Sequence, residues 1–411
     1  MTSRRSLRGQ ALVFLLPLLL ALVAAGYAAY EAGRRVHEKR RLVDAADAAA
    51  LSAAAWQARA LDFEAYTNRA IVANQVVVAQ AVSVRAFSDY VNTLLPRAAT
   101  ITQWIPALGT ATTTLAESWR SVDGLLQPTL SALETAASIG AYDLAAAQRF
   151  MHLATLEAVP AAVRANLRAA DPDYELTPAG ETMLARWAID WTEFASFYGG
   201  AWRWRPADVV TRSLDGFTVE RNFTIRPLLG LDVLRVVKRG GTELIDFETW
   251  RALDTLSVHR RRNFLFGSIR ERDVIAWGGA QAGGATAQRG SHGGAYAANP
   301  QAARRAEASM IGNIGYRGLP SAYDLSVEQR QRFSPPRIVV RARLVGEPAI
   351  HAEAVATTPF ARPVERADRL EERPSLYAPF WRARLVAPRN DERLLAATLD
   401  ATPTWIALVP R

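Results

Sequence analysis

The sequence predicts an α+β protein. An N-terminal transmembrane helix continues into a long helix, a helical region follows, and the C-terminal part is an antiparallel β-rich domain. Three observations support this order. Residues 11–30 are apolar and uncharged. No proline interrupts the chain between Pro17 and Pro96, so one helix can continue far beyond the apolar run. From residue 201 onward, short runs of branched and aromatic residues alternate with glycine and proline, which is typical of strands.

The first 30 residues resemble a membrane anchor. Residues 1–10 form a short basic arm, and residues 11–30 supply the roughly 20 apolar positions that a bilayer core requires. Lipid offers no hydrogen-bond partners to the backbone, so this segment should be helical. Basic residues lie on both sides of the run, which leaves the positive-inside rule undecided. We expect the short arm inside the cell and the bulk of the chain outside; a cleaved secretory signal is the alternative.

Composition limits the classes of partner. The 411 residues can hold two or three domains, and the absence of cysteine excludes disulfides and thiolate metal sites. The net charge of +9 comes from arginine, since Lys39 and Lys238 are the lysines, and alanine is abundant. This bias makes the charge poor evidence for a polyanion, and we expect no nucleic-acid partner. The basic cluster at 34–41 suits phospholipid head groups better.

Small residues cover much of the long helix predicted at residues 31–95. Such a surface lets another helix approach closely, and an amide among apolar residues can fix the register of the contact. We assign six residues to this helix–helix interface: Ala46, Ala49, Ala50, Ala53, Asn68 and Asn74. The partner is either another helix of this chain or a helix of an assembly partner. In the second case, leucine at Ala49 and Ala53 should disturb partner contact and leave membrane insertion intact.

The helical pattern continues over residues 96–200. Four prolines should divide it into short helices. They are Pro96, Pro106, Pro128 and Pro160.

Residues 201–411 should be β-rich. We expect a hairpin turn at 238–242, and Trp202–Arg205 in a strand with its aromatic side chains in the core. Residues 278 to about 300 are rich in Gly, Ala and Ser and predict a flexible loop. The strands on both sides of this loop should form one antiparallel sheet, because each set alone is marginal.

No catalytic, cofactor-binding or metal-binding set emerges. The histidines lack ligand spacing, and neither a phosphate-binding loop nor a nucleophile elbow is present. We therefore expect a non-enzymatic protein without cofactor or small-molecule substrate. Two alternatives stay open. One is the extracytoplasmic ligand-binding or sensory part of a receptor complex. The other is an envelope enzyme using Glu243, Asp246 and Glu248, which would have to cluster around one pocket.

Two motifs near the N-terminus point to a family. RGQALV begins at Arg8 and leads into the apolar run, and DAADAAA at 44–50 follows that run. Together, over roughly the first 60 residues, they resemble TadE/TadG-like proteins of the Flp (tight adherence, type IVc) pilus system. The resemblance implies an inner-membrane, single-pass component of pilus assembly, with the N-terminus cytoplasmic and the bulk periplasmic. Its expected partners are other pilus assembly proteins or pilin-like helices, and membrane lipid.

The resemblance also implies a candidate processing site between Gly9 and Gln10. In processed pilin-like members a glutamate follows the A-L-V sequence, whereas this chain has Phe14. A glutamate inside the bilayer is costly and usually functional. Its replacement favours an accessory component, either a periplasmic scaffold or a minor-pilin-like subunit, over a polymerising pilin.

Overall fold

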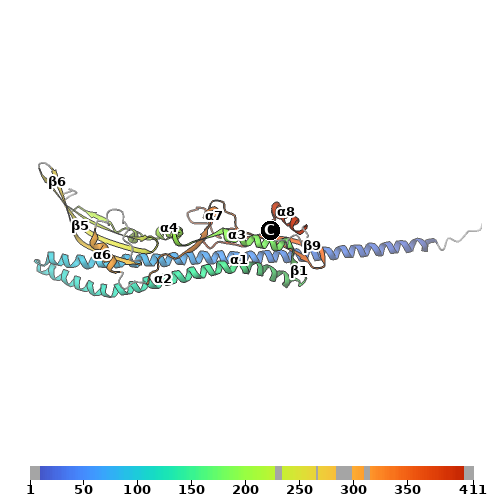
Figure 1. The fold of residues 1–411 in the computed structure, drawn as a ribbon, viewed down its shortest axis with the longest axis horizontal. Helices are drawn as coiled ribbons and strands as arrows, with labels where there is room; N and C mark the ends of the chain where they lie inside the picture. Colours follow the sequence, from blue (N-terminus) through green and yellow to red (C-terminus); the bar gives the residue numbers. More distant parts are fainter. Residues whose placement is uncertain (1–9, 227–233, 265–266, 284–298, 310–314, 402–411) are drawn as a thin grey trace, which may run out of the picture.

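The computed structural model describes residues 10–226, 234–264, 267–283, 299–309 and 315–401. It confirms the α+β class. A long helical hairpin forms one layer, and strands with shorter helices form a second layer along it (Figure 1). The predicted processing residue Gly9 lies outside the described residues, and Gln10 is the first residue of the first helix.

Two helices form the hairpin. Helix α1 spans Gln10–Thr102 and α2 spans Pro106–Ala170. At 1.5 Å per residue, the 93 residues of α1 extend about 140 Å. The segments predicted at 11–30 and 31–95 are therefore parts of one uninterrupted helix.

The prediction that four prolines divide the helical region was wrong at three of them. Pro96 lies inside α1, and Pro128 and Pro160 lie inside α2; Pro106 alone begins a helix. An interior proline removes one backbone hydrogen bond and costs about 3 kcal/mol. Tertiary packing along the hairpin outweighs that local cost, because α1 and α2 contact each other over much of their length.

In the described ranges, the strands form three antiparallel sheets rather than the single sheet predicted for the C-terminal part. The first has the order β3–β4–β5–β6. Its strands are Phe223–Ile225, Leu234–Ile245, Thr249–Phe264 and Gly267–Ala282. The second has the order β1–β8–β9–β10. Its strands are Tyr174–Leu176, Arg337–Leu344, Glu347–Thr357 and Arg384–Val386. A third pairs β2 (Ala195–Tyr198) with β7 (Ala322–Leu325).

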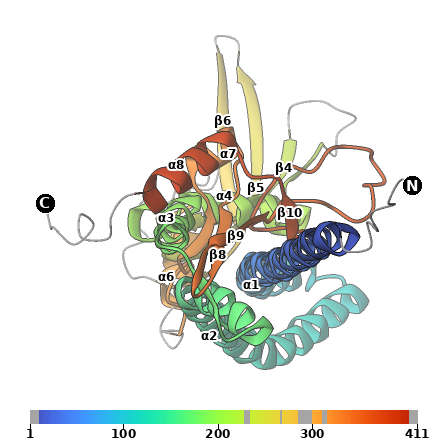
Figure 2. The same ribbon diagram turned by 90° about the vertical axis from the view of Figure 1, so that its right-hand side faces the viewer.

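Shorter helices connect these strands. They are α3 (Pro178–Phe194), η1 (Gly200–Trp202), α4 (Trp204–Arg212), α5 (Gly216–Val219), α6 (Pro300–Ser309), α7 (Val327–Gln331) and α8 (Asn390–Ala401). Figure 2 shows the strands and α3 gathered over α1, with α2 below it. Because α1 is long enough to support two sheets side by side, each sheet buries one face against the helix, and they need not merge.

The predicted hairpin turn at 238–242 was wrong. These residues lie inside β4, and the turn comes at Asp246 and Phe247, both with positive φ. The glycines there serve close packing: a Cβ on Gly240 would lie 2.0 Å from the Asp254 carboxylate. The prediction of a strand at Trp202–Arg205 was also wrong. Trp202 ends η1, Trp204 begins α4, and both tryptophans are exposed.

The flexible loop predicted at 278–300 is only partly testable. Strand β6 continues to Ala282, and Gly278 and Gly279 pack against the α1 backbone at 86–90 and against α6. Glycine at these two positions lets β6 lie close to the helices. The sequence prediction had interpreted the same small residues as the composition of a flexible loop. Residues 284–298 lie outside the described residues.

Candidate functional site: the exposed anchor and the buried face of α1

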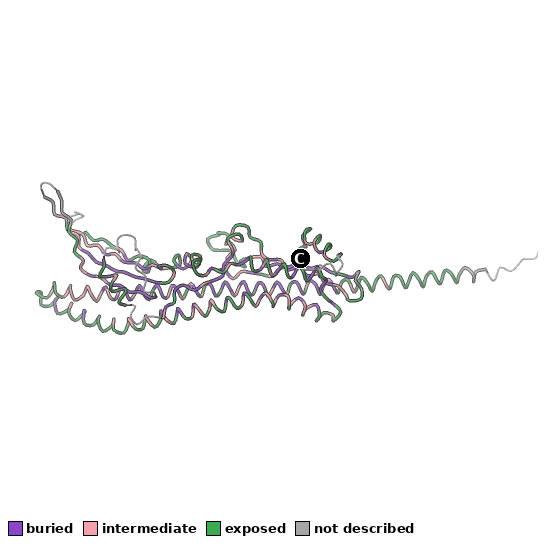
Figure 3. Tube along the Cα trace, viewed as in Figure 1, coloured by how far each residue is buried: buried purple, intermediate pink, exposed green. Residues whose placement is uncertain are grey.

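The N-terminal part of α1 stands apart from the rest of the molecule. Side chains from Leu15 to Tyr30 are exposed, whereas burial against the body begins at Leu42 (Figure 3). Within the described residues, α1 is the helix long and apolar enough to cross a membrane, and none of its apolar window is buried. Exposed apolar surface on this scale needs a covering, and a bilayer supplies one.

A charged stretch at residues 31–41, which we call the collar, separates the apolar anchor at residues 11–30 from the folded body that begins at Leu42. Arg34 forms ion pairs with Glu31 and Glu38 at i−3 and i+4, at 3.0 and 2.9 Å. Such pairs support the helix where no tertiary contact does. Arg41 lies 3.6 Å from Asp171 at the end of α2, which is the first ion pair between α1 and the body. The helix therefore leaves the apolar segment at Tyr30 without a break and enters the body at Leu42, about three turns later.

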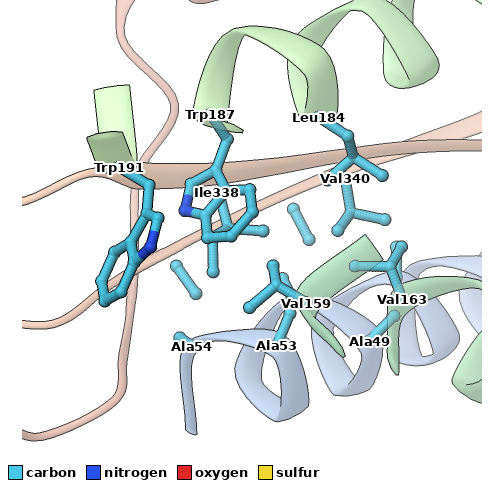
Figure 4. Packing of buried hydrophobic residues seen from close by; sticks show 14 of the residues in the cluster. Ala49, Ala53, Ala54, Val159, Val163, Leu184, Trp187, Trp191, Ile338 and Val340 are labelled. Carbon is cyan, nitrogen blue, oxygen red and sulfur yellow. The ribbon is translucent and has the colours of Figure 1, made fainter. Parts of the chain in front are cut away.

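The predicted alanine seam is buried inside the chain's own fold. Ala46, Ala49, Ala50 and Ala53 have no exposed surface and belong to one hydrophobic cluster. Figure 4 shows how α2, α3 and β8 contribute the opposing side chains. The labelled ones are Val159, Val163, Leu184, Trp187, Trp191, Ile338 and Val340. In this structure, the helix–helix interface is thus internal, formed by α1 with α2 and covered by α3 and β8, and these alanines are not available to another subunit.

Asn68 fixes the register of this internal contact. Its Nδ2 donates to the carbonyls of Tyr323 and Leu376 at 2.7 and 2.6 Å, and its Oδ1 accepts from Gln148 on α2 at 2.7 Å. One side chain thus joins α1 to α2, to β7 and to the segment before β10. Asn74, by contrast, donates to the carbonyl of Ala70 within its own helix at 2.8 Å. A Cβ on Gly140 of α2 would lie 3.5 Å from the Asn74 Oδ1, so the two helices pass close to each other here.

The same face of α1 carries further polar residues that sequence reasoning missed. The Gln57 amide donates to Thr358 and accepts from the Trp187 indole, both at 2.6 Å. The Gln75 Oε1 accepts from the Tyr316 hydroxyl at 2.8 Å and from the Trp250 indole at 3.2 Å. Gln57, Asn68 and Gln75 therefore each fasten a different part of the C-terminal region onto α1.

A buried acid–histidine pair lies between Gln57 and Asn68. The Oε1 of Glu64 is 2.8 Å from the Nδ1 of His152, whose ring stacks between Trp191 and Tyr323. Burial raises the pKa of the Glu64 carboxyl, and the hydrogen bond from His152 opposes that shift only in part. His152 is thus a core histidine with a partner, 88 residues from it in sequence.

A second buried pair joins α1 to α2 nearer the turn of the hairpin. Arg85 donates from one Nη to both oxygens of Glu134 at 2.8 and 3.0 Å, and also to Gln127 and the carbonyl of Ser309. Charge-assisted hydrogen bonds hold this buried pair firmly, and loss of one partner leaves an uncompensated charge. Sequence alone gave no sign of this pair, because its members are 49 residues apart.

The three acids of the enzyme alternative do not face one described cavity. Glu248 pairs with Arg203, Asp246 occupies the β4–β5 turn, and Glu243 is opposite Arg251 on β5. Burial raises the pKa of Glu243, and the charge of Arg251 opposes it. None of the three lines the cavity of about 470 Å³ beside Trp187. In the part of the chain that the structure describes, the three acids therefore do not gather around one pocket, as the enzyme hypothesis requires.

These features define a class: an anchored protein whose membrane helix is also the central element of its folded body. Residues 9–57 match the family model described as putative Flp pilus-assembly TadE/G-like. This match confirms, for the N-terminal segment, the resemblance seen in the RGQALV and DAADAAA motifs. No curated protein and no solved structure matches the chain. The matched segment covers the apolar run, the collar and the alanine seam.

Proposed function

We propose that this protein is a non-enzymatic component of Flp pilus assembly, acting as a scaffold on the periplasmic side of the inner membrane. The observation that carries the proposal is the continuity of α1, which joins the family-matched segment and its anchor to the core of a long rod. A rigid element fixed at one end can hold other assembly proteins at a defined distance from the bilayer. The N-terminal arm would be cytoplasmic and the body periplasmic.

Partners would contact the exposed side of α1 rather than its alanine seam. Leu51, Trp56 and Tyr66 are exposed on α1 while the opposite face is buried. Aromatic side chains contribute large contact areas to protein interfaces. The scaffold hypothesis therefore places partner helices, including pilin-like ones, on this outer face.

Photocrosslinking in cells that make Flp pili tests the proposal. A photoreactive residue at Tyr66 should crosslink the protein to another pilus component, whereas the same residue at exposed Leu394 on α8 should not. Deletion of the gene should abolish piliation, and the full chain should restore it. A version whose residues 10–30 are replaced by a cleavable signal should fail to restore pili. Normal piliation in the deletion strain would refute the assembly role.

The receptor alternative rests on one cavity. The space of about 470 Å³ beside Trp187 is within the range of small-molecule sites and has charged side chains of both signs, including Arg186, Asp190 and Glu193. If this cavity serves a receptor, the purified full chain should release a bound small molecule on heating, detectable by mass spectrometry. Arg186→Glu should abolish retention, and an empty wild-type protein would count against this alternative.

A further inference from the structure

The end of the molecule farthest from the anchor is an uncharged helical turn. We call residues 98–116, which join α1 to α2, the distal tip. From the collar at Glu31 to Thr102, α1 extends roughly 110 Å, so the distal tip lies far from the membrane that holds the anchor (Figure 1). No charged residue occurs within the distal tip, and the first ones beyond it are Arg97 and Glu117.

Large apolar side chains are exposed at the distal tip. Trp104 is 82% exposed, Ile101 63%, Ile105 56% and Leu108 46%. Gly109 lets the two helices close tightly there, because a Cβ on it would lie 2.8 Å from the Cα of Gln103. All four residues lie at the turn between α1 and α2, within residues 101–108. Exposed apolar surface of this kind marks an interaction site when it is grouped.

The polar groups of the distal tip are largely satisfied within it. Its threonine hydroxyls donate to backbone carbonyls one helical turn earlier. The residues concerned are Thr100, Thr102, Thr110, Thr112 and Thr113. The Trp104 indole donates to the carbonyl of Ile101. Hydroxyls that keep their hydrogen bonds can leave water at little cost, which favours an apolar environment over a polar partner surface.

Positive charge lies at the same end of the molecule. In the hairpin of β5 and β6, the described side chains include Arg260, Arg261 and Arg272, together with the acids Glu271 and Asp273. Arg235, His259 and Arg272 are opposite one another across β4, β5 and β6. Burial, followed by the charges of Arg272, Arg235 and Arg239, lowers the pKa of His259. Figure 1 shows the β5–β6 hairpin at the same end as the turn of the helices.

We propose that the distal tip inserts into the surface of a second, anionic lipid bilayer, so that the protein bridges two membranes. The apolar side chains would enter the boundary between head groups and acyl chains, where tryptophan is favoured, and the nearby arginines would attract anionic head groups. A protein partner is the competing occupant. The proposal depends on the N-terminal anchor and not on the role in pilus assembly.

Vesicle flotation with the full chain tests this proposal. The protein is first incorporated into nanodiscs of neutral phosphatidylcholine, which occupy the anchor. Separate vesicles of phosphatidylcholine, with or without phosphatidylglycerol, are then added. The nanodisc-held protein should float with the anionic vesicles and less with the neutral ones. The double variant Ile101→Ser, Trp104→Ser should reduce flotation at least tenfold.

A matched control uses two exposed apolar residues elsewhere on α2. Leu125→Ser, Phe150→Ser removes similar apolar surface away from the distal tip and should float like the wild type. The proposal is overturned if the wild type floats no better than empty nanodiscs, or if the tip variant and the control lose binding equally. A different result would point to a protein as the binding partner of the distal tip. In that case the wild type would not float with vesicles, and the tip variant would abolish piliation while the control variant would not. If the wild-type protein does not enter nanodiscs, its N-terminal apolar segment is not a membrane anchor, and the protein does not bridge two membranes.

Discussion

Leucine at Ala49 should destabilise the folded body of this protein. Ala49 has no exposed surface and faces side chains of α2, α3 and β8 (Figure 4). Leucine adds three carbon atoms to a site without room for them. Overpacking a filled core costs typically 1–3 kcal/mol, since neighbours must leave their preferred rotamers. The expected loss for Ala49→Leu is therefore about 2 kcal/mol in the free energy of unfolding.

The matched control is Ala48→Leu, one residue earlier on the exposed side of α1. Alanine and leucine are both strong helix formers, and surface changes usually stay within about 0.5 kcal/mol. Urea unfolding of the full chain in detergent, followed by far-UV circular dichroism, gives the two midpoints. Equal midpoints for both variants would refute the internal packing of the seam. An unchanged midpoint together with lost piliation for Ala49→Leu would show instead that the seam contacts a partner.

Three further predictions test the buried polar contacts. Asn68→Ala should cost roughly 1–3 kcal/mol, because two buried carbonyls lose their donor, whereas Asn74→Ala should cost less; urea midpoints compare them. Arg85→Ala should cost about 3–5 kcal/mol, and much of that should return when Glu134→Leu is added, as a double-mutant cycle can measure. Burial raises the pKa of Glu64, so this carboxyl favours folding most at low pH, and its contribution declines as pH rises above its usual 4.5. Glu64→Gln should therefore flatten the fall of stability with pH, and an unchanged pH profile would contradict the assignment.

The fold was most predictable where a single helix dominates. Absence of prolines and the apolar run predicted the path of α1 as far as Pro96, and packing with α2 carried it on to Thr102. The buried face of α1 could have been predicted more fully, because Gln57, Leu61, Glu64 and Asn68 recur at spacings of four and three residues. Such spacing places them on one side of a helix. Polar residues on this otherwise apolar face indicated that it contains buried hydrogen-bond networks.

The strands were harder to place because their arrangement depends on distant surfaces. Three sheets form among the described residues where one was predicted, since local sequence does not show how many sheets the length of α1 can support. The run Lys238–Thr242 looked like a turn because it holds two glycines. Its glycine at 240 instead makes room for Asp254, whose carboxylate pairs with Lys238 and Arg221. The partners of a charged side chain across strands cannot be read from sequence when the register is unknown.

The family match and the structure together explain why one helix serves both as anchor and as core. The matched segment ends at residue 57, at the glutamine that fastens α3 and the start of β8 onto α1. Downstream, Asn68 and Gln75 repeat that arrangement for other elements. Each amide fixes its element at a set height on the helix, because a shift by one residue would break the hydrogen bonds and bury polar groups without partners. The continuity of α1 therefore sets the height of these elements along the helix, as the proposed scaffold role requires.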